Sequence, residues 1–258
     1  MKLSCCAYSY RDLLTAGRMT LEGFLDTAVQ IGLDGVELTS YYFPEQTPDY
    51  LHRIRRACFA RGLEVAGTAA GGNFANADAA GRRKQIEHVK DWLAKSEMLG
   101  SPVLRVFAGG VPQGCERGVA EQWVRDGLAE CAEFGAKHGV ALGLETHGGL
   151  TGDADGVLAL IQPLADNPWV GVNLDFGNLT GDIYEQYRRL APHTITTHVK
   201  PTVAQGAGRE LVDYRRVVRI MREAGYRGFL SIEFEEPEDP VVGVPRFAAY
   251  LRGCIEDA

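Results

Sequence analysis

The stretches that decide the fold are GVALGLETH (139–147), VGVNLDFGN (170–178), TITTHVK (194–200) and RGFLSIEFE (227–235). Each is an apolar run typical of a buried strand, and each carries a possible metal ligand near its end. These residues are Glu145, Asp175, His198 and Glu233, spaced by 30 (145 to 175), 23 (175 to 198) and 35 (198 to 233) residues. Such a spacing holds about one strand, one helix and two loops. Ligands at the ends of four successive parallel strands would converge at one end of a β/α barrel.

Outward from these four stretches, short apolar runs alternate with longer amphipathic runs along the whole chain. We predict strands at 3–8, 34–39, 63–69, 103–108, 140–146, 170–175, 194–199 and 229–234. We predict helices at 20–31, 48–61, 78–99, 118–138, 153–165, 180–190, 213–224 and 241–256. Strict alternation predicts a parallel sheet with crossover helices. Eight repeats favour closure of this sheet into a barrel over an open, doubly wound sheet. We therefore expect an α/β fold, a (β/α)8 TIM barrel, as a single domain over residues 1–258.

Composition excludes several classes of protein. The formal net charge of −7 disfavours binding to nucleic acid or to an anionic membrane surface. None of the six cysteines forms a C-x-x-C pair, so free thiols in a reducing compartment are expected. The N-terminal MKLSCCAYSYRD lacks the long apolar region of a signal peptide, and no apolar run is long enough to span a membrane. We expect a cytoplasmic soluble protein.

The four strand-end residues suit a metal. Three carboxylates and one imidazole match a hard or borderline divalent ion such as Mn²⁺, Mg²⁺ or Co²⁺. The alternative is that charged residues often end strands without binding anything, but four in consecutive units favour the metal. Two carboxylates on opposite sides of a substrate could then move protons beside a carbonyl, one removing a proton and the other returning one to the opposite face.

Other polar side chains fall at the predicted strand ends, where barrel sites form. We expect six of them to bind substrate: Tyr8, Glu37, Arg105, His147, Asn178 and Lys200. Structural alternatives stay open for most of these. Arg105 could pair with a barrel carboxylate, His147 could orient Glu145, and Glu37 could form an ion pair. Asn178 could cap a helix, and Lys200 could be a solvated charge at the rim.

The segments GLDGVEL, LGLETHGG, NLDFGN, HVK and GYRGFLSIEFE resemble the sugar phosphate isomerase/epimerase family, also called the xylose isomerase-like barrel family. The resemblance implies that Glu145, Asp175, His198 and Glu233 bind one divalent ion, Mn²⁺ first, with Mg²⁺, Co²⁺ or Zn²⁺ as alternatives. It also implies that Glu145 and Glu233 are the acid/base pair, that the substrate is a small sugar or keto sugar, and that the protein can form a homodimer.

The chain departs from the family pattern at several positions. Pro201 follows Lys200 where many relatives have Asp, and Asn178 stands where some ketose epimerases carry His. The predicted strand ends at 68–70 and 107–108 offer no His for the three-zinc cluster of endonuclease IV-like members. We expect a metal-dependent sugar isomerase or epimerase that works through an enediolate. The alternatives are a lyase or dehydratase that uses the same enolate, and a non-catalytic sugar-binding barrel.

Overall fold

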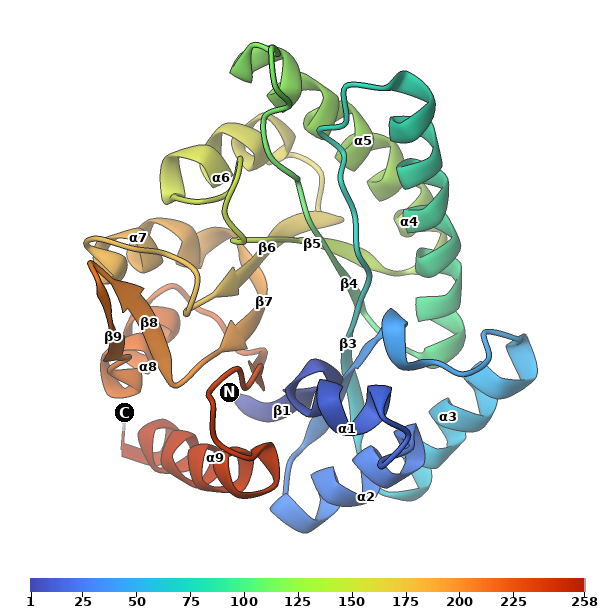
Figure 1. Cartoon of the computed structure of the whole chain (residues 1–258), viewed down its shortest axis with the longest axis vertical. Coiled ribbons are helices and arrows are strands. Elements are labelled where there is room, and N and C mark those ends of the chain that lie inside the picture. Colours follow the sequence, from blue (N-terminus) through green and yellow to red (C-terminus); the bar gives the residue numbers. More distant parts are fainter. Residues whose placement is uncertain (258) are drawn as a thin grey trace.

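The computed structural model describes residues 1–257 and shows a closed barrel of parallel strands in the order β1-β10-β7-β6-β5-β4-β3-β2 (Figure 1). The barrel strands are β1 (Lys2–Cys6), β2 (Gly35–Thr39), β3 (Glu64–Ala69), β4 (Val103–Val106), β5 (Ala141–Glu145), β6 (Val170–Asp175), β7 (Thr194–Val199) and β10 (Phe229–Ile232). The predicted (β/α)8 TIM barrel is confirmed.

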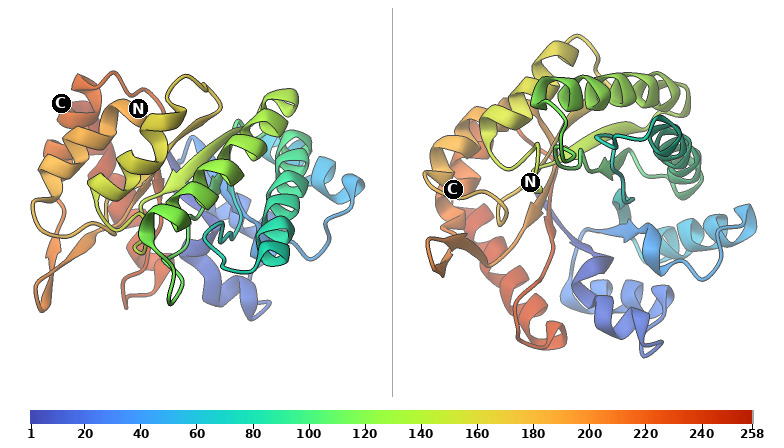
Figure 2. Two further views of the ribbon diagram at one scale, coloured as in Figure 1. Left: turned by 90° about the horizontal axis from the view of Figure 1, so that it is seen from above. Right: turned by 45° about the horizontal axis from the view of Figure 1, so that its top comes forward.

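Helices surround the barrel on its outside (Figures 1 and 2). They are α1 (Arg11–Thr15), α2 (Leu21–Ile31), α3 (Pro48–Ala60), α4 (Ala79–Leu99), α5 (Arg117–His138), α6 (Ala154–Ile161), α7 (Ile183–Leu190), α8 (Tyr214–Glu223) and α9 (Pro240–Asp257). Within residues 1–257, none of these helices combines the length and the apolar content that crossing a bilayer requires.

Helix α8 shows how local sequence sets the ends of an element. The side chain of Asp213 accepts a hydrogen bond from the amide of Arg215 at 3.0 Å, as expected of an N-cap residue. Val217 and Met221, one helical turn apart, are buried against the barrel. Gly225 follows the helix with a φ of +82°, a left-handed conformation that glycine adopts without strain.

Several strand ends differ from the prediction. β1 stops at Cys6 because residues 7–10 turn into a 3₁₀ helix, and β10 stops at Ile232. The amide of Glu233 still donates to the carbonyl of Val199 at 3.0 Å, so the ladder continues one residue past β10. The antiparallel hairpin of β8 (Thr202–Gln205) and β9 (Gly208–Leu211) was not predicted. All four residues of β9 are exposed, so it lacks the buried alternation that marks a strand in sequence.

The register between neighbouring strands places the candidate ligands within a two-residue step of one another at the same end of the barrel. Asp175 on β6 lies opposite His198 on β7, and Glu145 on β5 lies opposite Asn173 on β6. His198 is in turn opposite Ser231 on β10, one pleat below Glu233. The ligand-bearing strands are therefore neighbours, and their polar ends meet at the carboxyl end of the barrel.

Candidate metal centre

The structure brings Glu145, Asp175, His198 and Glu233 together in one buried group. Each offers one ligand atom, and these atoms all lie within 4.8 Å of one another. Nδ1 of His198 lies 3.4 Å from Oε2 of Glu145 and 3.6 Å from Oε2 of Glu233. It lies 3.9 Å from Oδ2 of Asp175. Four donors from four β/α units thus surround one point.

Glu37 orients the imidazole of His198. Its two carboxylate oxygens lie 2.9 and 3.0 Å from Nε2 of His198, and its Oε2 also accepts a hydrogen bond from Ser231 at 3.1 Å. With Nε2 held in this way, Nδ1 is the ring nitrogen that faces the other carboxylates. A carboxylate behind a histidine is the usual support for a metal-binding imidazole. The structure therefore places Glu37 behind His198 and not in the lining of the adjoining cavity, which differs from the substrate contact that the sequence predicts.

The charges of the site fit a divalent cation. The buried carboxylates and cations are Glu37, Glu145, Asp175 and Glu233, with Arg105 and Lys200. With a neutral His198, the four carboxylates exceed the two cations by two charges. Burial raises the pKa of Asp175 to about 7, against the opposing effect of Lys200. Burial disfavours the charged form of His198, but the surrounding carboxylates nevertheless raise its pKa well above the usual value. These two shifts favour the binding of protons in a site that carries excess negative charge, and a divalent ion would balance that excess.

Lys200 reaches into the carboxylate group. Its Nζ lies 3.0 Å from Asp175, 3.2 Å from Glu233 and 2.7 Å from Glu235. Its side chain is 4% exposed, so it is not the solvated rim charge that we considered. The stem of Lys200 crosses Gly177 so closely that a Cβ there would lie 2.5 Å from the lysine Cδ, which explains a glycine at this position of the loop after β6.

Arg105 makes a buried ion pair with Glu145. Its Nε lies 2.9 Å from Oε2 of Glu145, and its guanidinium group lies 4.2 Å from the centre of the Phe107 ring. Burial opposes ionisation of Glu145, but the charges of Arg105 and His198 hold the pKa of this carboxyl well below its usual range. Glu145 is therefore a carboxylate at neutral pH, in the form that a metal ligand or a general base requires.

A cavity of about 180 Å³ opens beside the ligands. It is lined by Tyr8, Tyr41, Arg105, Phe107, Glu145, His147, Glu233 and Glu235. Of the predicted substrate-binding residues, Tyr8, Arg105 and His147 line it, whereas Glu37, Asn178 and Lys200 do not. The side chain of His147 is 52% exposed, and its Nδ1 lies 2.9 Å from Oε1 of Glu145. His147 thus touches both the carboxylate of Glu145 and the cavity.

Asn178 supports a candidate ligand, Asp175, and does not line the cavity. Its Nδ2 donates to Oδ2 of Asp175 and to the carbonyl of Thr146, both at 2.9 Å. Its Oδ1 accepts a hydrogen bond from Lys200 at 3.2 Å. These contacts link the loop after β6 to the end of β5. Asn178 therefore holds Asp175 in place. This contact differs from both interpretations of the sequence, which were substrate binding and helix capping.

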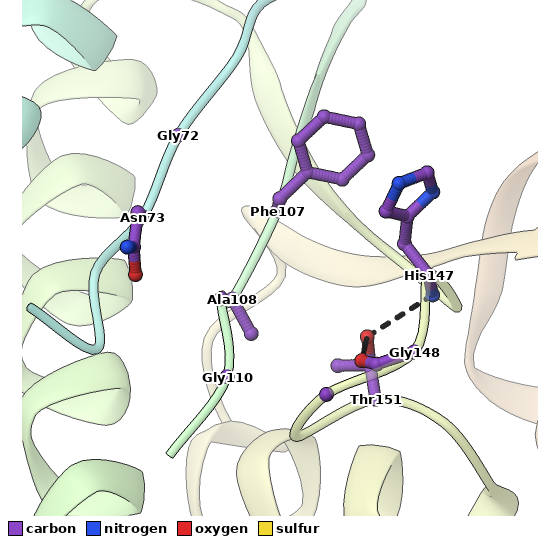
Figure 3. A pocket seen from close by; sticks show the side chains of 10 residues that line it. Gly72, Asn73, Phe107, Ala108, Gly110, His147, Gly148 and Thr151 are labelled. Atoms are coloured by element: carbon purple, nitrogen blue, oxygen red, sulfur yellow. Dashed lines mark hydrogen bonds between the residues drawn. The ribbon is translucent and has the colours of Figure 1, made fainter. Parts of the chain in front are cut away.

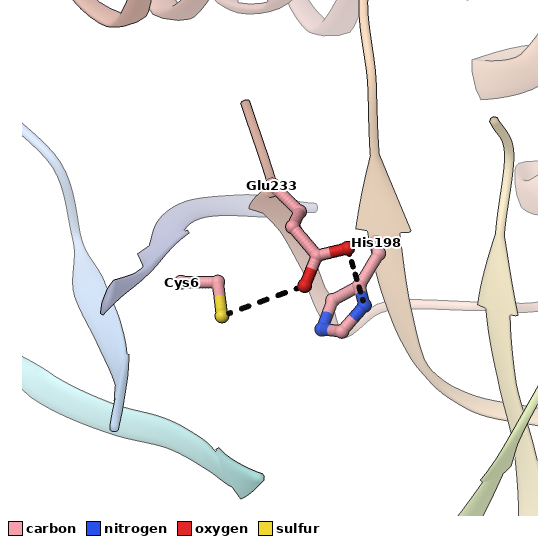
Figure 4. A group of neighbouring side chains, drawn as sticks. All are labelled: Cys6, His198 and Glu233. Atoms are coloured by element: carbon pink, nitrogen blue, oxygen red, sulfur yellow. Dashed lines mark hydrogen bonds and ion pairs between the residues drawn. The ribbon is translucent and has the colours of Figure 1, made fainter. Parts of the chain in front are cut away.

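Asn173, Tyr41 and Cys6 are among the residues of this site that we did not predict from the sequence. Asn173 donates to Oε2 of Glu145 at 3.2 Å. Its position two residues before Asp175 on the same strand was the available signal, because side chains repeat on one face every two residues. Tyr41 lines the cavity from the turn after β2. Cys6 points at Glu233, with Sγ 3.9 Å from Oε1 (Figure 4). Burial raises the pKa of Cys6 well above its usual value, so it stays a neutral thiol and a poor metal ligand.

Comparison with known proteins shows the family of this chain. Residues 25–253 match the family model described as xylose isomerase-like TIM barrel. Similar solved structures include L-ribulose 3-epimerase, with a TM-score of 0.82 and 19% identity over 99% of this chain and 95% of that one. The 3-keto-D-glucoside 4-epimerase of E. coli aligns with a TM-score of 0.76 and 17% identity over 91% and 95%. The probable 3-DHS dehydratase of Bacillus anthracis aligns with a TM-score of 0.74 and 18% identity over 99% of both chains. At these identities the likeness shows the fold. No curated protein sequence matches the chain.

Proposed function

This chain belongs to the xylose isomerase-like TIM barrel family, and from that premise we propose that it is a divalent-metal-dependent isomerase or epimerase of a keto sugar. The observation that carries the proposal is that Glu145 and Glu233 both face one small cavity while also belonging to one group of four ligands. L-ribulose 3-epimerase and D-psicose 3-epimerase, both sugar epimerases by name, share the fold.

The donor set indicates the class of ion that would fit, a hard or borderline divalent cation. Three carboxylates and one imidazole nitrogen would hold the ion, with Mn²⁺ first and Mg²⁺, Co²⁺ or Zn²⁺ as alternatives. When bound, the ion would supply Lewis-acid stabilisation of the negative charge that develops on the substrate oxygens. The cytoplasmic location and the possible homodimer stay predictions.

The residues of the chain would perform the proton transfers. Glu145, ionised beside Arg105, removes a proton from the carbon next to the carbonyl. This step leaves an enediolate, and Glu233, which reaches the cavity from the loop after β10, takes up a proton from solvent and delivers it to the carbon from its own side. His147 and Tyr8 line the same cavity and hydrogen-bond the substrate hydroxyls. The enediolate that exists between the two proton transfers is the intermediate expected of a 3-epimerase or an aldose–ketose isomerase.

A dehydratase is the second candidate, favoured by one specific observation. The hydrogen bond to Glu145 raises the pKa of His147, which favours the protonated form of an imidazole that lines the cavity. Such a group can donate a proton to a departing hydroxyl after the first proton is removed. The dehydratase of Bacillus anthracis shares the fold. Because the first step is common to both reactions, only the product separates them.

Solvent exchange tests the proposal. The protein, loaded with Mn²⁺, Mg²⁺, Co²⁺ or Zn²⁺ in turn, is incubated with a panel of keto sugars in D₂O. We expect deuterium at the carbon next to the carbonyl of at least one sugar, measured by NMR. Recovery of an epimer or isomer supports the main proposal, and an unsaturated product supports the dehydratase. Absence of exchange across the panel with every metal would overturn both.

Metal affinity should depend on pH. The pKa of Asp175 is raised by burial and that of His198 by the surrounding carboxylates, so both bind protons more readily than usual, and each must be unprotonated to become a ligand. Protons therefore compete with the metal, and affinity should rise with pH. With a pKa of about 7 for Asp175, we expect roughly a tenfold gain from pH 6 to pH 8 from this residue alone. Titration calorimetry in two buffers of different ionisation enthalpy measures both the affinity and the protons released. Equal affinity at the two pH values would contradict this assignment.

A further inference from the structure

A second cavity adjoins the candidate metal centre. It has a volume of about 310 Å³ and lies between the loops that follow β3, β4 and β5 (Figure 3). Phe107 and His147 line both cavities, and their ring centroids are 4.2 Å apart. Ligand pockets commonly measure about 300–1,000 Å³. The 180 Å³ cavity beside the ligands is below that range, so a larger substrate would extend past these two rings.

The wall of the second cavity is polar but almost uncharged. Apart from His147, its lining within the described part of the chain contains no Lys, Arg, Asp or Glu. The wall offers backbone groups of the glycine-rich loops, the side-chain amide of Asn73 and the ring of Phe107 (Figure 3). Thr151 fixes one of the loops, since its hydroxyl accepts a hydrogen bond from the amide of His147 at 3.1 Å. Neutral hydrogen-bonding groups beside an aromatic ring suit an uncharged polyhydroxylated ligand, and the absence of Lys and Arg from this lining disfavours phosphate.

The glycines of this cavity fall into two kinds. Gly149 has a φ of +56°, and a Cβ there would lie 2.7 Å from the carbonyl oxygen of Gly109, so the packing of the loops requires a glycine. At Gly110 a Cβ would meet only Gly149 Cα at 3.9 Å, and at Gly72 the nearest atom would be the carbonyl oxygen of Phe107 at 3.5 Å. These are ordinary contacts. The fold would accept side chains at Gly72 and Gly110, and their absence keeps the cavity open.

We propose that this second cavity is a subsite for an uncharged sugar ring attached to the reacting keto sugar. The inference rests on the proposed function, because it takes the ring beside Glu145 and Glu233 as the reacting one. Nδ1 of His147 contacts Glu145, so Nε2 is the nitrogen available to the oxygen that joins the two rings. The substrate class is then a keto-glycoside or keto-disaccharide.

Binding of unreactive sugars tests this subsite. Metal-loaded protein is titrated with methyl β-cellobioside, methyl α-maltoside and trehalose, with methyl glucoside and inorganic phosphate for comparison. We expect saturation-transfer NMR to show contact with both rings of at least one disaccharide, with an affinity about tenfold above that of methyl glucoside. Gly110→Leu fills the cavity and should remove that gain, as should Gly72→Leu. Gly118→Leu, where a Cβ would meet nothing within 4 Å, is the matched control and should leave the gain intact.

Three results would overturn the subsite. The first is that no disaccharide binds more tightly than methyl glucoside. The second is that the gain survives in well-folded Gly110→Leu and Gly72→Leu. The third is that phosphate binds and that these variants weaken it, which would make the cavity an anion site. Failure of the proposed function is distinguishable, since wild-type protein would then bind a disaccharide across both cavities without exchanging deuterium into any keto sugar.

Discussion

Glu145→Gln and Glu233→Gln should each lower the turnover of a keto sugar by about 10²–10⁴-fold, the usual contribution of a positioned general acid or base. Glutamine keeps the shape of glutamate and an oxygen that can still contact a metal, but it cannot accept a proton from carbon. Glu145 has the stronger case as the base, because Arg105 at 2.9 Å stabilises its ionised form. Turnover is measured with the metal content of each variant determined alongside.

Deuterium exchange separates the roles of the two glutamates. If Glu145 removes the proton and Glu233 returns one, Glu233→Gln should abolish epimer formation while solvent deuterium still enters through Glu145. Glu238→Gln is the control, since its carboxylate pairs with Arg246 outside the candidate site. Full activity of either Glu145→Gln or Glu233→Gln, with metal bound, would remove that residue from the mechanism.

His198→Ala should lose both the metal and a large part of the stability of the barrel. Loss of a ligand should cost more than the roughly 10–100-fold in affinity that loss of a supporting partner costs. We also expect the free energy of unfolding in metal-free buffer to fall by roughly 3–5 kcal/mol, because Glu37 would be left buried without its partner. Glu37 is 2% exposed, and its pKa lies below the usual value despite its burial because His198 stabilises the ionised form. Denaturant unfolding and metal titration give the two quantities.

The double variant His198→Ala/Glu37→Gln separates the two effects. Removing the carboxyl charge should recover part of the lost stability and none of the metal affinity. A double variant as unstable as His198→Ala would attribute the loss to the space left by the imidazole and not to the unpaired carboxylate. Undiminished metal affinity in His198→Ala would show that the ion binds elsewhere.

The architecture and the convergence of the four candidate ligands could be predicted from sequence because local patterns encode them. Apolar runs of strand length alternate with amphipathic runs, and caps such as Asp213 and Gly225 mark helix ends. The two-residue repeat of a strand predicts that His198 and Lys200 share a face, and both contact Glu233 in the structure. Once the strands are parallel neighbours, the convergence of their ends follows from the barrel.

Only the tertiary structure decided which polar residues line the cavity beside the candidate ligands. Glu37 and His198 are 161 residues apart in the chain, and barrel closure brings the carboxylate behind the imidazole and not into the cavity. The pairing of Asn173 with Glu145 depends on the register between β5 and β6. The second cavity requires three loops to pack against one another. Sequence periodicity reports which face of an element a side chain occupies, whereas contacts between distant elements depend on how the whole barrel closes.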